Sequence, residues 1–156
     1  PGPLRLMAGV WAEELDPLWK DQANELRPCE GNSLGLKDPA RINSFCELIH
    51  AEGAEVLATY GKDWYAGRPV LTRNRFGKGQ VYYLAAMTDS SFVEDFTRSL
   101  AADTGLTSVE PGLPHGVQAS LRRGKDRDWV FTMNWNTVPA ADLPPWGCRI
   151  EERKHS

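Results

Sequence analysis

The glycines and basic residues of "TRNRFGKGQ" are the first group that could do chemistry, because a G-x-G segment can bind phosphate. Gly77 and Gly79 supply the glycine spacing, and Lys78 stands between them. A phosphate loop needs a helix after its glycines, since the helix N-terminus provides aligned N–H groups. The strand-like run "VYYLAA" follows instead. The pattern therefore predicts a β-turn between two strands and argues against a phosphate site.

Paired carboxylates are the second group, because glycosidases use two of them. The adjacent pairs are Glu13–Glu14 and Glu151–Glu152. Neighbouring side chains of a strand point to opposite faces, whereas a retaining glycosidase needs two carboxyl groups about 5 Å apart across one substrate. Both pairs are therefore interpreted as solvated or subunit-contact residues.

Nucleophiles and metal ligands form the third group. The chain has no G-x-S-x-G elbow, and its three cysteines do not have zinc-finger spacing. Cys46 and His50 would face each other on a helix, but on a strand they would lie about 13 Å apart on one face. A buried cysteine beside a surface histidine is favoured. We expect no catalytic residue, no metal ligand and no cofactor-binding residue.

Aromatic residues remain, with six tryptophans in 156 residues. Trp11 and the segment "DWYAGRP", which contains Trp64 and Tyr65, could form a sugar platform or a protein contact. Protein interfaces are enriched in Trp, Tyr and Arg. Packing and subunit contact are therefore favoured over direct sugar binding.

These residues must be positioned by short elements. The expected strands are 6–11, 42–50, 54–60, 68–74 and 81–87, with a helix over 43–52 left open as an alternative. A helix is expected over Phe92–Asp103, begun by a Ser91–Glu94 capping box and ended by Gly105. The segment 109–116 is rich in Pro and Gly and predicts a linker. Beyond it, 116–123 and 128–135 predict a hairpin, and "WGCRIEE" a last strand.

Composition narrows the function classes. The chain is 41% hydrophobic and 25% charged, as in globular proteins. A net charge of -3 argues against a nucleic-acid binder, and no run approaches the roughly 20 apolar residues of a membrane helix. Residues 12–30 are acidic and residues 61–80 are basic, so the two segments could pair. Three widely spaced cysteines favour a reduced, cytoplasmic protein.

Three blocks of sequence resemble one family in order: "GPLRLMAGVWAEELDPL", "CELIHAEGAEVLATYGKDWYAGRPVLTRNRFGKGQVYYLAA" and "LPHGVQASLRRGKDRDWVFTMNW". They are similar to the region that follows the catalytic barrel in glycoside hydrolase family 42 β-galactosidases. The resemblance covers nearly the whole chain, and its central block is the most specific.

The resemblance implies an α/β fold. In that family a (β/α)8 barrel hydrolyses terminal β-D-galactosides with retention, using two glutamates. An amidotransferase-like (flavodoxin-like) trimerisation domain and a small β-sandwich follow the barrel. Residues 1–110 resemble the latter part of the α/β domain, and residues 114–156 the antiparallel β-sandwich-like unit. Part of the family's parallel sheet is expected to be missing. "ADLPPWGCRIEE" follows "VFTMNWN" so soon that the β domain is expected to be shortened.

The expected function is a non-catalytic accessory and oligomerisation region of a β-galactosidase. The implied partners are two further copies, forming a homotrimer, and a β-galactoside bound by the missing barrel. The chain alone is expected to be inactive, and no cofactor is implied. The alternative is a carbohydrate-binding module that uses the Trp/Tyr surface. The residues expected at the subunit contact or the active-site rim are Trp11, Glu13, Glu14, Asp16, Trp64, Tyr65, Arg68, Arg73 and Arg75.

Overall fold

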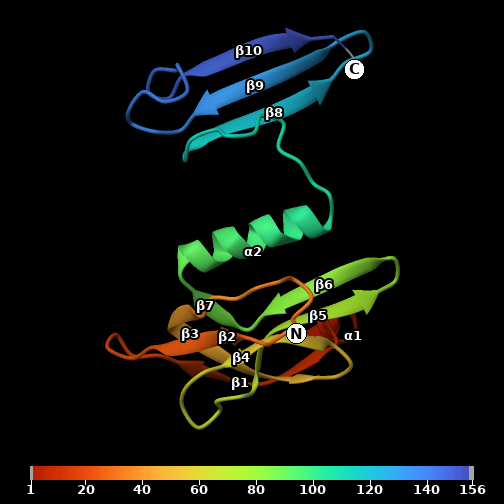
Figure 1. The fold of residues 1–156 in the computed structure, drawn as a ribbon, viewed down its shortest axis with the longest axis vertical. Coiled ribbons are helices and arrows are strands. Elements are labelled where there is room, and N and C mark those ends of the chain that lie inside the picture. The colour runs from red at the N-terminus through yellow and green to blue at the C-terminus, as the bar shows by residue number, and fades with distance from the viewer. Residues whose placement is uncertain (1, 155–156) are drawn as a thin grey trace. The chain divides into compact units, whose positions relative to one another are not determined.

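The computed structural model describes residues 2–154, which divide into two units (Figure 1). The first unit ends at Thr104 and the second begins at Gly105. Sheet dominates both, and every pairing of named strands within the described residues is antiparallel. The expected parallel α/β arrangement is therefore wrong for these residues. A parallel neighbour requires a crossover connection, and here strand follows strand until a single long helix ends the first unit.

The first unit is a seven-stranded sheet with little helix. Its strands follow the order β1-β3-β2-β4-β5-β6, and β7 also pairs with β3. The elements are η1 (Gly2–Leu4), α1 (Arg5–Ala8), β1 (Val10–Pro17), β2 (Asn24–Pro28), β3 (Ala40–Ala51), β4 (Glu55–Tyr60), β5 (Pro69–Phe76), β6 (Gly79–Leu84), β7 (Ala86–Thr88) and α2 (Ser90–Asp103).

The segment expected to be a strand over 6–11 begins as a helix instead. Gly9 ends α1 with a left-handed backbone, φ 64°. A Cβ at this position would lie 2.6 Å from Cγ of Asn74, whose amide donates to the carbonyl of Met7 at 2.9 Å. This approach of β5 to the helix requires glycine, so the chain turns at Gly9 and β1 starts at Val10.

The strand interpretation of 42–50 is confirmed, and the helical alternative is wrong. Ile42, Cys46 and Leu48 of β3 are fully buried, as expected for side chains at even spacing on one face of a strand. They form the larger core with residues of β2, β4 and β5. A smaller cluster around Val10 and Ile49 completes the interior of the unit.

The predicted turn at "FGKG" is confirmed. Phe76 pairs with Gly79, so Gly77 and Lys78 form a two-residue hairpin loop between β5 and β6. Gly77 has φ 58°, which is the conformation that a tight hairpin requires of its first loop residue. Because β6 follows at once, the geometry of a phosphate loop is absent.

The expected helix over 92–103 is confirmed, but its predicted cap is wrong. The helix α2 begins at Ser90, and the Asp89 carboxylate accepts the N–H of Phe92 at 3.0 Å. Ser91 donates its hydroxyl to the same carboxylate at 3.0 Å and caps nothing itself. Phe92 is buried, and Phe96 stacks against it at 6.0 Å between ring centroids.

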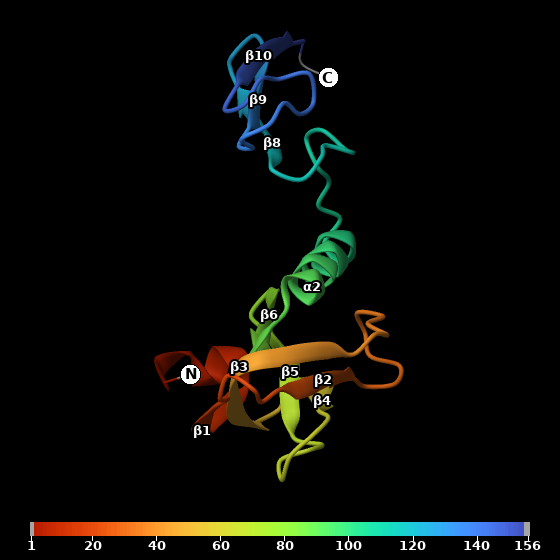
Figure 2. The same ribbon diagram turned by 90° about the vertical axis from the view of Figure 1, so that its left-hand side faces the viewer.

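The second unit is one antiparallel sheet of three strands, β8 (Val117–Arg123), β9 (Asp128–Asn134) and β10 (Cys148–Arg153), in the order β10-β9-β8 (Figure 2). The predicted hairpin is β8–β9, and the last strand is β10. A two-layered sandwich is not formed among residues 105–154. Asn134 organises the β9–β10 connection, because its amide donates to the carbonyls of Val138 at 2.9 Å and Pro144 at 3.0 Å.

Candidate subunit-contact surface

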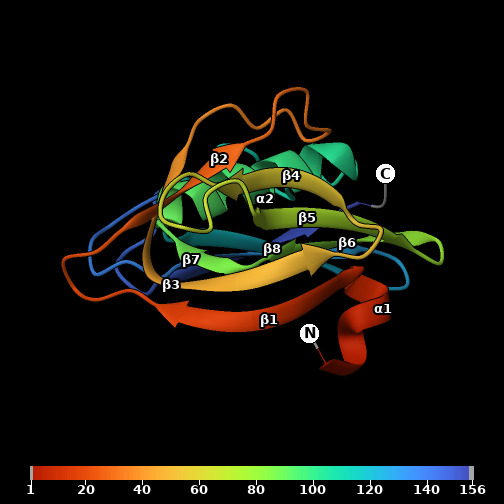
Figure 3. The same ribbon diagram turned by 90° about the horizontal axis from the view of Figure 1, so that it is seen from below.

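A register shift in β1 determines which residues of this strand lie on the face of the candidate subunit-contact surface. β1 lies beside β3 (Figure 3), with Trp11 opposite His50 and Asp16 opposite Cys46. The register shifts between Ala12 and Glu14. Partners in an antiparallel pair share a face, so Trp11 and Asp16 lie on the same face although five positions separate them. In a regular strand they would lie on opposite faces.

The loop 61–68 contributes the remaining residues of the candidate surface. It joins β4 to β5 and extends away from the sheet (Figure 1). Tyr65 anchors this loop: it is 1% exposed, and its hydroxyl donates to Oδ2 of Asp16 at 2.8 Å. Its ring meets that of Tyr60 edge to face at 5.1 Å. Burial raises the pKa of the Tyr65 hydroxyl, and its hydrogen bonds to Cys46 and Asp16 raise it further.

The anchored tyrosine holds Trp64 out at the surface. Trp64 is 70% exposed and meets the Tyr65 ring edge to face at 5.2 Å. The Arg68 guanidinium lies over the Trp64 ring, 5.5 Å from its centroid. Arg68 also donates to Oε2 of Glu13 at 3.0 Å. The guanidinium therefore connects the loop tryptophan to β1.

Glu13 continues this chain of contacts to β3. Its Oε2 lies 2.7 Å from Nε2 of His50, and the His50 ring stacks on Trp11 at 4.8 Å between centroids. Trp11, Glu13, His50, Arg68 and Trp64 thus form one connected set, which we call the β1–loop surface. It presents an exposed aromatic ring at each end and charged groups between them.

The electrostatics of Glu13 indicate what this surface can do. The hydrogen bond from His50, and then that from Arg68, lowers the pKa of the Glu13 carboxyl. A general acid in a glycosidase needs a carboxyl group whose pKa is raised. The pKa of Glu13 is instead lowered by its partners, so this carboxyl lacks the property that a general acid requires.

The other residues expected at the contact lie in different settings. Glu14 is exposed and makes no ion pair within the described residues. Arg73 pairs with Glu55 across β4 and β5 at 2.5 Å. Arg75 is exposed near the β5–β6 turn. Tyr65 is too buried for direct contact and acts as an anchor. Six of the nine expected residues are therefore gathered in one place: Trp11, Glu13, Asp16, Trp64, Tyr65 and Arg68.

His50 belongs to the surface, although the sequence pattern did not indicate it. The pattern singled it out only as a possible partner of Cys46. Cys46 is fully buried and hydrogen-bonds Tyr65, whereas His50 contacts Glu13 and Trp11. The acidic and basic segments 12–30 and 61–80 do meet, through Arg68 and Glu13.

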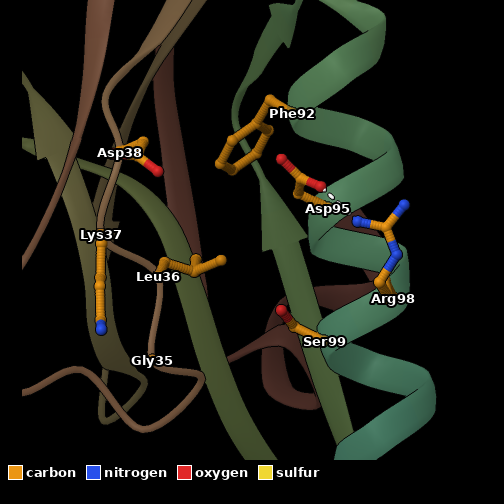
Figure 4. A pocket seen from close by; sticks show the side chains of 8 residues that line it. All are labelled: Gly35, Leu36, Lys37, Asp38, Phe92, Asp95, Arg98 and Ser99. Atoms are coloured by element: carbon orange, nitrogen blue, oxygen red, sulfur yellow. Dashed lines mark hydrogen bonds and ion pairs between the residues drawn. The ribbon is translucent and has the colours of Figure 1, made fainter.

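One hollow of the first unit lies away from the β1–loop surface. This hollow of about 260 Å³ lies between the loop before β3 and α2 (Figure 4). Phe92 points from α2 toward Leu36 in the loop, and Asp95 pairs with Arg98 along the helix at 2.6 Å. The side chains that line it include no nucleophile paired with a base.

Across residues 2–154, no three His, Cys, Asp or Glu side chains lie together as a metal site would require. None of the helices in that range is long and apolar enough to cross a bilayer.

Comparison with known proteins identifies the family. Residues 1–107 match the model of the β-galactosidase trimerisation domain. β-Galactosidase Pbg of Clostridium perfringens is 42% identical over 176 aligned positions, covering 99% of this chain. β-Galactosidase BglY of Alicyclobacillus acidocaldarius is 45% identical over 86% of this chain. The crystal structure of the β-galactosidase from Rahnella sp. R3 superposes with a TM-score of 0.85 at 42% identity over 99% of this chain.

The chain is short against these relatives. It spans 26% of the Clostridium enzyme, 20% of the Alicyclobacillus enzyme and 25% of the Rahnella structure. The Clostridium alignment has 176 positions, whereas the chain has 156 residues. At least 20 positions (176 minus 156) of that alignment therefore have no residue of this chain. Together the family model, the identities and the fold show that this chain belongs to the glycoside hydrolase family 42 β-galactosidases and carries their trimerisation domain.

Proposed function

We propose that this chain holds three subunits of a β-galactosidase together and that the β1–loop surface forms part of the contact. The match of residues 1–107 to the trimerisation domain carries the proposal. The surface adds a structural reason, since its two exposed tryptophans and its arginine are the residue types that dominate interface energies.

The rigidity of the surface supports the same proposal. Trp64 is held by Tyr65 and Arg68 before any partner arrives. Ordering a free side chain on binding costs roughly 0.5–1.5 kcal/mol, and this cost is smaller for a ring that is already positioned. Arg68 and Glu13 are about one-third and two-fifths exposed, so a partner can still reach their polar atoms.

The activity of the whole protein is a further part of the proposal. Its barrel would hydrolyse terminal β-D-galactosides with retention, and this chain would bind no substrate by itself. The flavodoxin-like fold expected of the intact domain would require parallel strands from outside the segment described. The domain limits of 1–110 and 114–156 belong to the same proposal. We also propose a cytoplasmic location, which the three free cysteines support.

The alternative of a carbohydrate-binding module is not favoured. Trp11 is stacked on His50, and Arg68 lies over the Trp64 ring, so each exposed ring is already engaged by a side chain of the protein. Calorimetry with galactose and lactose tests this point. Saturable binding by the isolated chain, with no self-association, would favour the module instead.

Sedimentation analysis tests the trimer. We expect the chain to assemble in multiples of three copies. The double variant Trp64→Ala/Arg68→Ala should lose this stoichiometry, because it removes the aromatic anchor and its cation. Trp19→Ala is the matched control, since Trp19 is 76% exposed but lies outside the surface. A wild-type mass that is never a multiple of three would refute the proposal. Loss of assembly in both variants would show that the β1–loop surface is not special.

A further inference from the structure

One face of the β8–β9–β10 sheet exposes large apolar side chains of β9 and β10, beside the polar residues Gln118, Ser120 and Arg122 of β8. The strand register places alternate residues of all three strands on it. Trp129 is 37% exposed and Ile150 54% exposed, although a sheet normally buries its apolar face. The opposite face contains Val130 and Thr132, which are 0% and 1% exposed. We call the exposed side the open face; the residues that matter are Arg122, Trp129, Phe131, Met133, Ile150 and Glu152.

The strand β10 also turns its apolar residue to the open face, and all of its residues are exposed. Its polar residues Arg149 and Glu151 pair with Thr132 and Val130, on the buried side of β9. Ile150 lies opposite Phe131, on the open face. In a strand of a sheet that has one solvent-exposed face, the apolar residues normally point to the interior and the polar residues to solvent. β10 has the opposite arrangement.

We infer that the open face docks against the same face of a second copy of this chain. Arg122 and Glu152 both lie opposite Trp129, one on each neighbouring strand. If the two-fold axis runs along β9, Arg122 meets Glu152 of the second copy, and the pair forms twice. Such self-complementarity is what a two-fold contact requires. Glu152 already pairs with Arg127 at 2.8 Å, but both groups are about half exposed and can accept another partner.

The size of the face decides how strong this contact is. Three strands of six or seven residues cover a footprint of about 20 by 14 Å. This is well below the ~800 Å² per partner of a stable interface, so one contact is weak. A trimer would carry three such faces, and several contacts made at once raise the overall affinity. The docking of two open faces does not depend on the proposed trimer.

Light scattering over a range of concentrations tests the inference. We expect the wild-type chain to exceed three copies at high concentration and Ile150→Lys, which puts a charge on the edge strand β10 of the open face, to remain at three. Val138→Lys is the control, because Val138 is 60% exposed in the β9–β10 connection, and it should assemble as the wild type does. The double variant Trp64→Ala/Arg68→Ala should assemble into two copies. The triple variant that also carries Ile150→Lys should be a monomer.

A second pair of variants tests the contact with exposed charges, whose replacement should not disturb folding. Arg122→Glu changes an exposed charge on the open face, and Arg123→Glu makes the same change on the opposite face. The first should raise the dissociation constant of the two-fold contact at least tenfold, and the second should leave it nearly unchanged. Cys148, opposite Met133 on the open face, should react more slowly with a thiol reagent at high concentration.

The outcomes separate the two proposals. A wild type of two copies that becomes one with Ile150→Lys would support the open face and refute the trimer. A wild type that stays at three copies at every concentration would overturn the inference. So would equal effects of the two arginine variants.

Discussion

The Tyr65 hydroxyl donates to Oδ2 of Asp16 at 2.8 Å and joins two segments that lie 49 residues apart. Because Tyr65 is buried, the bond fixes the loop 61–68 against β1. Trp64 and Arg68 therefore stand at defined positions beside Glu13. This hydrogen bond therefore joins the acidic segment of the chain to the basic one, as the ion pair of Arg68 with Glu13 also does.

Removing this bond should loosen the loop. Tyr65→Phe keeps the ring but leaves Asp16 without its donor, and we expect a loss of roughly 1 kcal/mol in the free energy of unfolding. Urea denaturation measures the loss, and amide hydrogen exchange should be faster in the loop. Tyr82→Phe is the control, because its hydroxyl bonds the exposed side chains of Gln80 and Asp103 and does not anchor a loop. Equal effects of the two variants would contradict an anchoring role.

The ion pairs of Glu13 should depend on pH. Its pKa is lowered from the ordinary value of 4.5, first by His50 and then by Arg68. A depressed pKa means that the stabilisation is present above this ordinary value and is lost as the pH falls through the folded pKa. Glu13→Gln should therefore be less stable than wild type near neutral pH. The difference should shrink in acid, as thermal unfolding at several pH values can show. A difference that grows on acidification would contradict the pairing.

The cap of α2 gives a sharp comparison of two residues. Asp89→Ala should destabilise the first unit by about 1 kcal/mol, because the N–H of Phe92 loses its acceptor. Glu94→Ala should change stability little, although a capping box at Ser91 would require Glu94. The Asp89 pKa is lowered by the bond from Phe92, so this stabilisation too should disappear in acid. Circular dichroism during urea unfolding measures both variants.

Asn134 should be critical for the second unit. It is 1% exposed, and its side chain also accepts the N–H of Asn136 at 3.0 Å. Asn134→Ala leaves several buried backbone groups without partners, at a cost of roughly 1–3 kcal/mol. Hydrogen exchange of residues 135–147 should accelerate strongly. Thr137→Ala, an exposed change in the same connection, should have little effect; if it is equally damaging, Asn134 is not the organising residue.

Local patterns in the sequence predicted local structure well. The β5–β6 turn, the β8–β9 hairpin and the body of α2 depend on residues within a few positions of each other, such as Gly77 and Lys78. The cap of α2 was mistaken because Asp89 and Ser91 are both good capping residues. Which of the two caps the helix depends on the direction in which the chain leaves β7, and the tertiary structure sets that direction.

The sequence by itself determined the family, through the order of its three blocks, and the residue types of the candidate surface. Only the tertiary structure decided how they meet. Asn74 approaches Gly9 from 65 positions away, so no local pattern could reveal that α1 precedes β1. The register shift between Ala12 and Glu14 brings Trp11 and Asp16 to one face. In a regular strand these two side chains would point to opposite faces, because successive side chains alternate between the faces of the sheet. Only a bulge changes which face the following residues occupy.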